Sequence, residues 1–146
     1  IDSTSIVSNY ALNGGAVFVP ENLDGATISR TTIWQNSSPN IDGIDITPWG
    51  SINNISITNS NINNSGYSIY NGNTIDVVSG IDNYWGHTTG PYHPTQNSTG
   101  QGDSVNAYVN VTTWLATPNT DAPPIPAQHR SADPRAGKEC RCRWSP

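Results

Sequence analysis

The chain has 146 residues, of which 34% are apolar and only 12% are charged. Arg30 is the only Lys or Arg before residue 130, whereas nine Asp and Glu residues lie between Asp2 and Asp121. Because so acidic a body repels phosphate backbones, we expect no nucleic-acid partner. No stretch approaches the ~20 continuous apolar residues of a membrane helix, so we also expect no membrane span.

Short segments that alternate apolar and polar residues recur along residues 1–82. Three of them follow a glycine, and these glycines are Gly15, Gly43 and Gly66. Companion pairs of apolar residues begin at Val7, Ile28 and Ile57, at steps of 21 and 29 residues. Such a period, built from short strands, is typical of a solenoid whose turns bury one continuous core. Because Met is absent and Asn, Ser, Thr and Gly are abundant, helices are disfavoured. The pattern predicts an all-β parallel β-helix of about three to four coils.

The alternation also predicts which side chains face the core. We expect three inward ladders, which are Ala16, Phe18, Ile44, Ile46, Tyr67 and Ile69; Ala26, Ile28, Ile55, Ile57, Ile75 and Val77; and Leu12, Ile33 and Ile62. Asparagines at the corners should tolerate left-handed backbone angles and stack their amides from coil to coil. We expect the first coil to leave an unpaired N-terminal edge, through which the chain could associate with itself.

From Asn83 onward the repeat gives way to NYWGHTTGPYHP and then to GQGDSVNAYVNVTTWL. These motifs resemble the C-terminal end of right-handed parallel β-helix proteins of the pectin-lyase-like superfamily, with NosD-like β-helix repeats. The resemblance covers roughly residues 5–117. It implies a right-handed coil and the C-terminal part of a longer protein. Members include polysaccharide lyases, hydrolases and epimerases, accessory proteins with copper-related roles, and surface proteins without known chemistry.

The sequence divides into four parts. Residues 1–82 form the N-terminally truncated coils, and residues 83–116 form the last coil and an aromatic cap of Trp85, Tyr92, Tyr108 and Trp114. Residues 117–129 are predicted to be an extended Pro-rich linker, and residues 130–146 a disordered basic tail. Cys140 and Cys142 lie in that tail, and their spacing favours free thiols over a zinc site or a long-loop disulfide.

No complete catalytic constellation is predicted. The resemblance implies carboxylates on one outer face of adjacent coils, and Asp45 occupies such a position, but the equivalent residues are Val17 and Ser68. We therefore assign no catalytic residue. A metal site could use His87, His93 and Asp103, but their neighbouring glycines and prolines favour turn-forming roles. We predict no metal site and no cofactor.

A structural scaffold or surface-binding role is favoured over an enzyme, and carbohydrate binding is one form that this role could take. Sugar rings stack on aromatic faces, and Trp34, Trp49 and Tyr70 are expected to point outward, with Asp45 nearby to bond hydroxyl groups. We predict a non-catalytic scaffold, secreted or at the cell surface, whose partner is a polysaccharide or a cell-surface glycan. The alternative is a fragment of a polysaccharide-active enzyme (lyase, hydrolase or epimerase) whose active site lies on upstream coils.

Overall fold

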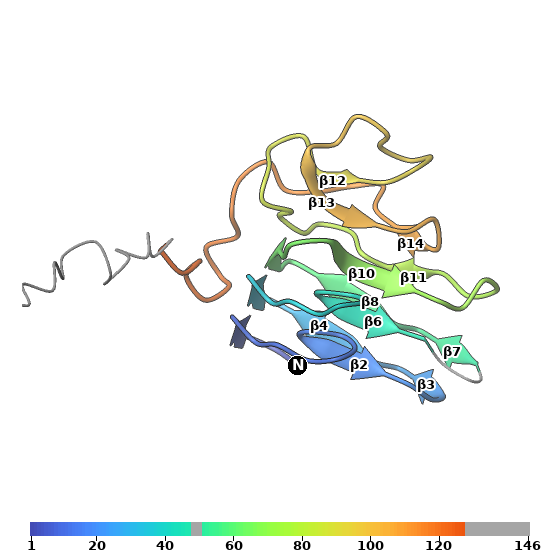
Figure 1. The fold of residues 1–146 in the computed structure, drawn as a ribbon. Helices are drawn as coiled ribbons and strands as arrows, with labels where there is room; N and C mark the ends of the chain where they lie inside the picture. The colour runs from blue at the N-terminus through green and yellow to red at the C-terminus, as the bar shows by residue number, and fades with distance from the viewer. Residues whose placement is uncertain (48–50, 128–146) are drawn as a thin grey trace, which may run out of the picture.

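The computed structural model describes residues 1–47 and 51–127, which form a stack of short parallel strands (Figure 1). These residues contain fourteen strands and no helix. Every pairing between two of the strands is parallel. The predicted all-β parallel β-helix is therefore confirmed, with about four turns.

The strands form four sheets along the stack. The three-stranded sheet contains β1 (Ser5–Val7), β5 (Thr32–Trp34) and β9 (Asn61–Asn63) in spatial order. The five-stranded sheet contains β2 (Val17–Val19), β6 (Ile44–Ile46), β10 (Tyr67–Asn71), β13 (Gly102–Val105) and β12 (Pro91–Tyr92). The four-stranded sheet contains β4 (Thr27–Ser29), β8 (Ser56–Thr58), β11 (Val78–Ser79) and β14 (Val109–Asn110). The short pair is β3 (Leu23–Asp24) and β7 (Ile52–Asn53).

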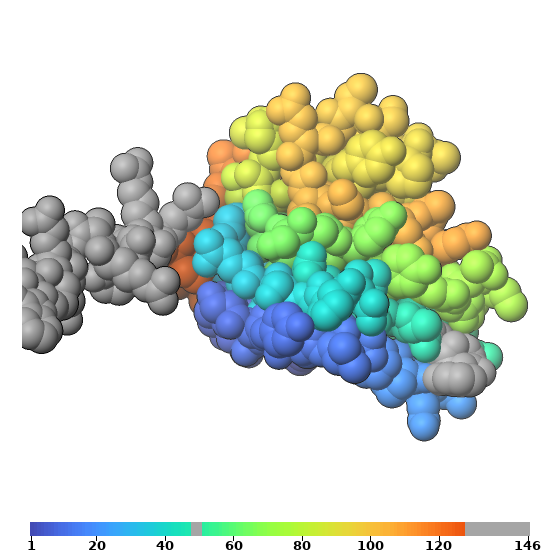
Figure 2. Space-filling view, in the orientation of Figure 1, coloured from blue at the N-terminus to red at the C-terminus, as the bar shows by residue number. Residues whose placement is uncertain are grey.

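Successive coils lie on one another as layers, from blue at the N-terminal end to yellow and orange at the other (Figure 2). Each pass of the chain is too short to bury an apolar face alone, so the core runs through the stack. Its buried members are chiefly β-branched, as strands with one inner face favour. They include Ile33, Ile44, Ile46, Ile57, Ile62, Ile69, Val78, Val105 and Val109.

The first predicted ladder is right for Ile44, Ile46 and Ile69, and Ala16 also packs partly buried against the core, but Phe18 was placed wrongly. Its buried members are Ile44, Ile46 and Ile69. Their partners in the first coil are Val17 and Val19. Phe18, which we expected inside, therefore lies on the outer face and is 45% exposed. The shift arises at the preceding glycine, because the Gly15 N–H donates to the Ile41 carbonyl at 3.0 Å. Gly15 is therefore aligned with the residue before Gly43 instead of with Gly43 itself, and the residues that follow it are displaced by one position.

The second predicted ladder is confirmed over two coils. Its confirmed members are Ala26, Ile28, Ile55 and Ile57. Ile75 and Val77 were wrongly placed inside, since they are 86% and 61% exposed. Val78 is fully buried and takes the inward position of this ladder in the third coil. The Asn73 side-chain oxygen Oδ1 accepts the N–H groups of Ile75 and Asp76, and this turn delays the start of the strand.

The third predicted ladder contains Ile33 and Ile62, both fully buried. Leu12 was wrongly included, since it is 71% exposed. Its place is taken by Ile6, which pairs with Ile33 on β5. In the next coil Trp85 occupies the position equivalent to Ile62, because the bridge between Asn61 and Tyr84 sets the register. The Trp85 side chain is fully buried.

The four aromatic residues expected to cap the core do not act alike. Trp85 is buried and Trp114 packs partly buried against the core. Tyr92 and Tyr108 are 44% and 37% exposed, contrary to expectation. Two indole rings, rather than four aromatic side chains, therefore pack on the core here.

Asparagine amides stack from coil to coil, as expected for asparagines at corners. The Asn36 side-chain oxygen accepts both the N–H and the side-chain amide of Asn9 at 3.0 Å. The Asn64 side-chain oxygen accepts the corresponding groups of Asn36 at 3.0 and 3.1 Å. Because Asn36 is fully buried and an unpaired buried amide is costly, its place in the ladder depends on both neighbours.

The segment expected to be a linker lies against the solenoid over residues 117–127, and we call it the C-terminal strap. It runs beside the ends of β1, β5 and β9 and is drawn in orange in Figure 1. The Asn119 N–H donates to the Asn61 side-chain oxygen at 2.8 Å, and the Asn61 amide donates to the Asn119 carbonyl at 3.1 Å. The Thr32 hydroxyl donates to the Pro123 carbonyl, and Ala122 is buried. The expected basic tail and both cysteines lie outside the described residues.

Candidate functional site

Four aromatic side chains occupy outer positions of the five-stranded sheet, and we call this set the aromatic face. They are Phe18 on β2, Tyr67 and Tyr70 on β10, and Tyr92 on β12. Phe18, Tyr67 and Tyr92 are 45%, 41% and 44% exposed. Tyr70 is half-buried, because its ring packs edge-on against Tyr67 with the ring centroids 5.6 Å apart. Exposed aromatic groups gathered on one sheet indicate an interaction surface.

A β-bulge in β10 turns Tyr67 outward. Ile69 pairs with Val105, whereas Tyr67 pairs with Ser104, so β10 uses one more residue than β13 at this point. An extra residue reverses the inward and outward alternation. The expectation that Tyr67 points into the core with Ile69 is therefore wrong.

Tyr70 and Asp45, both predicted to bind carbohydrate, are registered neighbours on β10 and β6. Phe18 is the neighbour of Asp45 on the other side. Asp45 is only 5% exposed, and its carboxylate accepts a hydrogen bond from the Thr47 hydroxyl. The structure thus brings two of the predicted residues together, but the Asp45 carboxylate is covered and engaged.

Trp34 does not belong to the aromatic face. It lies on β5 in the three-stranded sheet and is 9% exposed, so the expectation of an exposed indole is wrong. Tyr84 is brought beside it by the bridge to Asn61, and the Trp34 and Tyr84 rings stack with centroids 6.5 Å apart and planes 8° apart. The other predicted tryptophan, Trp49, lies outside the described residues.

Phe18, Tyr67 and Tyr92 are the members of the aromatic face that sequence reasoning missed. One signal could have found Phe18, because the apolar pair that flanks it matches the pair that flanks Asp45. Aligning these two tripeptides places Phe18 opposite Asp45, as the structure does. The bulge that exposes Tyr67 has no comparable signature in the sequence.

A buried carboxyl group continues the asparagine ladder. The Asp103 carboxylate accepts hydrogen bonds from the Asn64 N–H and the Ser68 hydroxyl, and Asn64 also donates its amide to the Ser68 oxygen at 2.8 Å. Burial raises the pKa of Asp103 to about 6, although these hydrogen bonds oppose the rise, and the nearby charge of Asp42 adds to it. The Asp103 carboxylate is therefore mostly enclosed and is engaged by groups of the solenoid itself.

His87 and His93, which the sequence offers as possible metal ligands, make hydrogen bonds within turns. His93 is fully buried, and its Nδ1 accepts the N–H groups of Thr95 and Gln96 at 3.1 and 2.9 Å. Burial lowers the pKa of His93 and favours the neutral ring. The Nδ1 of His87 lies 2.9 Å from the Thr89 hydroxyl. Within residues 1–47 and 51–127, no group of three or more His, Cys, Asp or Glu side chains could hold a metal ion.

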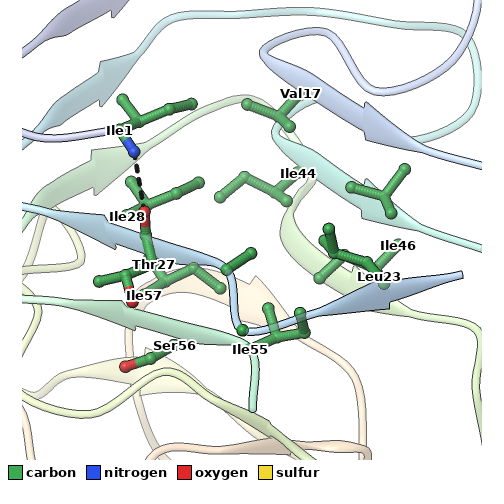
Figure 3. A pocket seen from close by; sticks show the side chains of 13 residues that line it. Ile1, Val17, Leu23, Thr27, Ile28, Ile44, Ile46, Ile55, Ser56 and Ile57 are labelled. Carbon is green, nitrogen blue, oxygen red and sulfur yellow. Dashed lines mark hydrogen bonds between the residues drawn. The ribbon is translucent and has the colours of Figure 1, made fainter. Parts of the chain in front are cut away.

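An apolar cavity of about 430 Å³ lies at the N-terminal end of the core, and we call it the end cavity. Figure 3 shows the side chains of Ile1, Val17, Ile28 and Ile44 around it. The Ile1 ammonium group donates to the Thr27 carbonyl at 2.8 Å, and the dashed line marks this bond. Side chains of the first coil therefore do not completely fill the apolar interior at this end of the solenoid.

No family model, no curated protein and no solved structure matches the chain. The part of the chain that the structure describes contains no helix that would reach across a bilayer. The aromatic face is thus the feature from which a function can be argued.

Proposed function

We propose that the chain is a non-catalytic scaffold, secreted or displayed at the cell surface, whose aromatic face binds carbohydrate. We further propose that it is a right-handed β-helix of the pectin-lyase-like superfamily. The observation that carries the binding function is the gathering of four aromatic side chains on the outer side of one sheet, three of them more than 40% exposed.

The chemistry of the face suits a sugar. The C–H groups on one side of a pyranose ring pack on an aromatic ring, and sheet strands hold these rings at fixed spacing. The phenolic hydroxyls of Tyr67, Tyr70 and Tyr92 can bond sugar hydroxyls at the edge of each stack. Rigid aromatic side chains lose little conformational freedom on binding, which favours affinity.

The alternative is a fragment of a polysaccharide-active enzyme whose active site lies on upstream coils; catalysis by the described coils themselves would need an accessible carboxylate on an outer face. In the described part of the chain, Asp45 is the carboxylate that lies in the aromatic face, and it is covered and bonded by Thr47. This arrangement gives no support to the enzyme, so the binding scaffold is the function we propose.

Replacing Tyr70 by Ala should weaken glycan binding about tenfold, which corresponds to about 1.4 kcal/mol. The change removes one stacking surface and the ring that supports Tyr67. The wild-type protein is first screened on a glycan array, and affinities for a bound glycan are then measured by calorimetry. Tyr10→Ala is the matched control, because Tyr10 is 74% exposed and lies outside the five-stranded sheet.

Two results would contradict this function. One is an array on which the folded wild-type protein retains no glycan. The other is equal loss of binding in Tyr70→Ala and Tyr10→Ala, since that would locate the contact elsewhere.

Self-association through the edge of the first coil is a second proposal. The strands β1 and β2 each have a free edge toward the N-terminal end, and the end cavity exposes apolar side chains beside them. Leu23→Lys places a charge at this cavity and should shift dimers to monomers in sedimentation velocity runs, whereas Ile75→Lys, at an exposed residue away from the cavity, should not. A wild-type protein that stays monomeric at high concentration would rule this out.

A further inference from the structure

Aromatic residues occur on every second strand of the five-stranded sheet. From the N-terminal end, the outer positions are Phe18 on β2, Asp45 on β6, Tyr70 and Tyr67 on β10, Ser104 on β13 and Tyr92 on β12. The strand register forms two lines, since Phe18, Asp45 and Tyr70 are consecutive partners, as are Tyr67, Ser104 and Tyr92. The two lines are offset by three residues along β10 and meet where the Tyr67 and Tyr70 rings touch, with their centroids 5.6 Å apart. Large rings therefore alternate with short polar side chains along the axis of the solenoid.

This alternation sets a repeat distance. Neighbouring strands are about 4.8 Å apart, so rings on alternate strands recur every ~9.6 Å. Two pyranose residues of an extended β-linked chain span a comparable length, and alternate residues of such a chain present the same side. A sugar chain that lies across the strands can therefore stack every second residue on a ring.

The alternative direction, along a single strand, fits less well. Tyr67 and Tyr70 are the two aromatic residues on β10, and their rings touch edge to face at 65° instead of lying side by side. They form one platform in the middle of the face. Phe18 and Tyr92 extend the face on either side of this platform, across the strands.

Charge restricts the kind of sugar. Arg30 is the only Lys or Arg before residue 130, and its guanidinium is paired with Asp2 near the four-stranded sheet. The outer positions of the aromatic face carry Asp45 and no basic side chain. A uronate or sulfate polymer would find no cation there and would meet the field of nine acidic residues.

We infer that the ligand of the aromatic face is an uncharged, extended polysaccharide that lies along the solenoid axis and stacks on Phe18, the Tyr67–Tyr70 platform and Tyr92. This inference rests on the proposed function. Along the solenoid axis, Phe18 and Tyr92 are separated by four strand spacings, about 19 Å, so the face accommodates roughly four sugar residues.

The test compares chain length and ring position. The probes are uncharged hexasaccharides of β-1,4-linked glucose, mannose and xylose, with the matching disaccharides, and binding is measured by calorimetry. We expect at least one hexasaccharide to bind more tightly than its disaccharide. Phe18→Ala and Tyr92→Ala should each weaken hexasaccharide binding about tenfold and leave disaccharide binding unchanged, with Tyr10→Ala as the folded control. Far-ultraviolet circular dichroism verifies that each variant keeps its strands.

A second comparison tests the charge argument. Wild-type protein should not bind hexagalacturonate, an anionic chain of similar length, whereas Ser104→Lys supplies a cation between the rings and should increase its binding. Equal binding of charged and uncharged hexasaccharides, no gain with chain length, or no effect of Phe18→Ala and Tyr92→Ala would overturn the inference. Each of these results leaves the proposed function standing if Tyr70→Ala still weakens glycan binding and Tyr10→Ala does not. Failure to bind any of the three uncharged probes also overturns the inference, and the glycan array then decides the proposed function separately.

Discussion

Replacing Ile62 by Ala is expected to lower the free energy of unfolding by about 3 to 4 kcal/mol. Ile62 is fully buried between Ile33 and Trp85 in neighbouring coils, so the substitution opens a cavity that neither neighbour can fill without moving its strand. Urea unfolding followed by tryptophan fluorescence gives the free energy, and an unchanged m-value shows that the transition itself is unaltered.

Ile75→Ala is the matched control. Ile75 is 86% exposed, and its truncation should change stability by less than about 0.5 kcal/mol. The two residues are chemically identical and lie in the same coil, so the comparison isolates burial. Similar losses of stability at both positions would show that the third coil does not bury Ile62 and expose Ile75.

Asp103→Asn is expected to remove a pH dependence of stability worth about 3 kcal/mol, the free energy that corresponds to a pKa raised from 3.8 to about 6. Because the folded-state pKa is raised, the fold favours the protonated carboxyl. Its contribution is fully present below pH 3.8 and is lost as the pH rises through about 6. The wild-type protein should therefore lose stability relative to the variant between pH 4 and pH 7.

The measurement is urea unfolding of both proteins at several values across this pH range. Asp24→Asn, which neutralises an exposed carboxylate, controls for the change in net charge. The groups around Asp103 that can take part are the Asn64 N–H, the Ser68 hydroxyl, the Ser104 N–H and the Asp42 carboxylate. Parallel pH profiles for wild type and Asp103→Asn would show that the buried carboxyl does not titrate in this range.

The sequence predicted the architecture because its signal is repeated. Ile28 and Ile33 recur 29 residues later as Ile57 and Ile62. Stacking these equivalent residues buries them, and this result does not depend on the geometry of the corners between the strands. The first coil was harder, because Val17, Phe18 and Val19 are all apolar and periodicity alone does not say which of them face inward. The choice depends on how Gly15 pairs, which is a backbone contact and leaves no pattern in the side chains.

The candidate site was only partly predictable for related reasons. Tyr70 and Asp45 follow from simple alternation, and the structure places them side by side. Tyr67 depends on a one-residue bulge, which reverses the face on which a side chain lies. Trp34 does occupy an outward position, but Tyr84 from a later coil covers it. Such burial arises from contacts between coils, which the local pattern around Trp34 does not contain.

The C-terminal strap also has a consequence for the order in which the chain folds. Rungs of the solenoid are linked by bonds between residues about one coil apart, whereas the bonds from Asn61 to Asn119 and from Thr32 to Pro123 join residues 58 and 91 positions apart. Loop-closure entropy makes such distant contacts slow to form before the intervening chain is compact. We therefore expect the strap to dock after β5 and β9 have stacked, which makes its docking a late step that closes over formed coils and links residues 117–127 to the second and third coils.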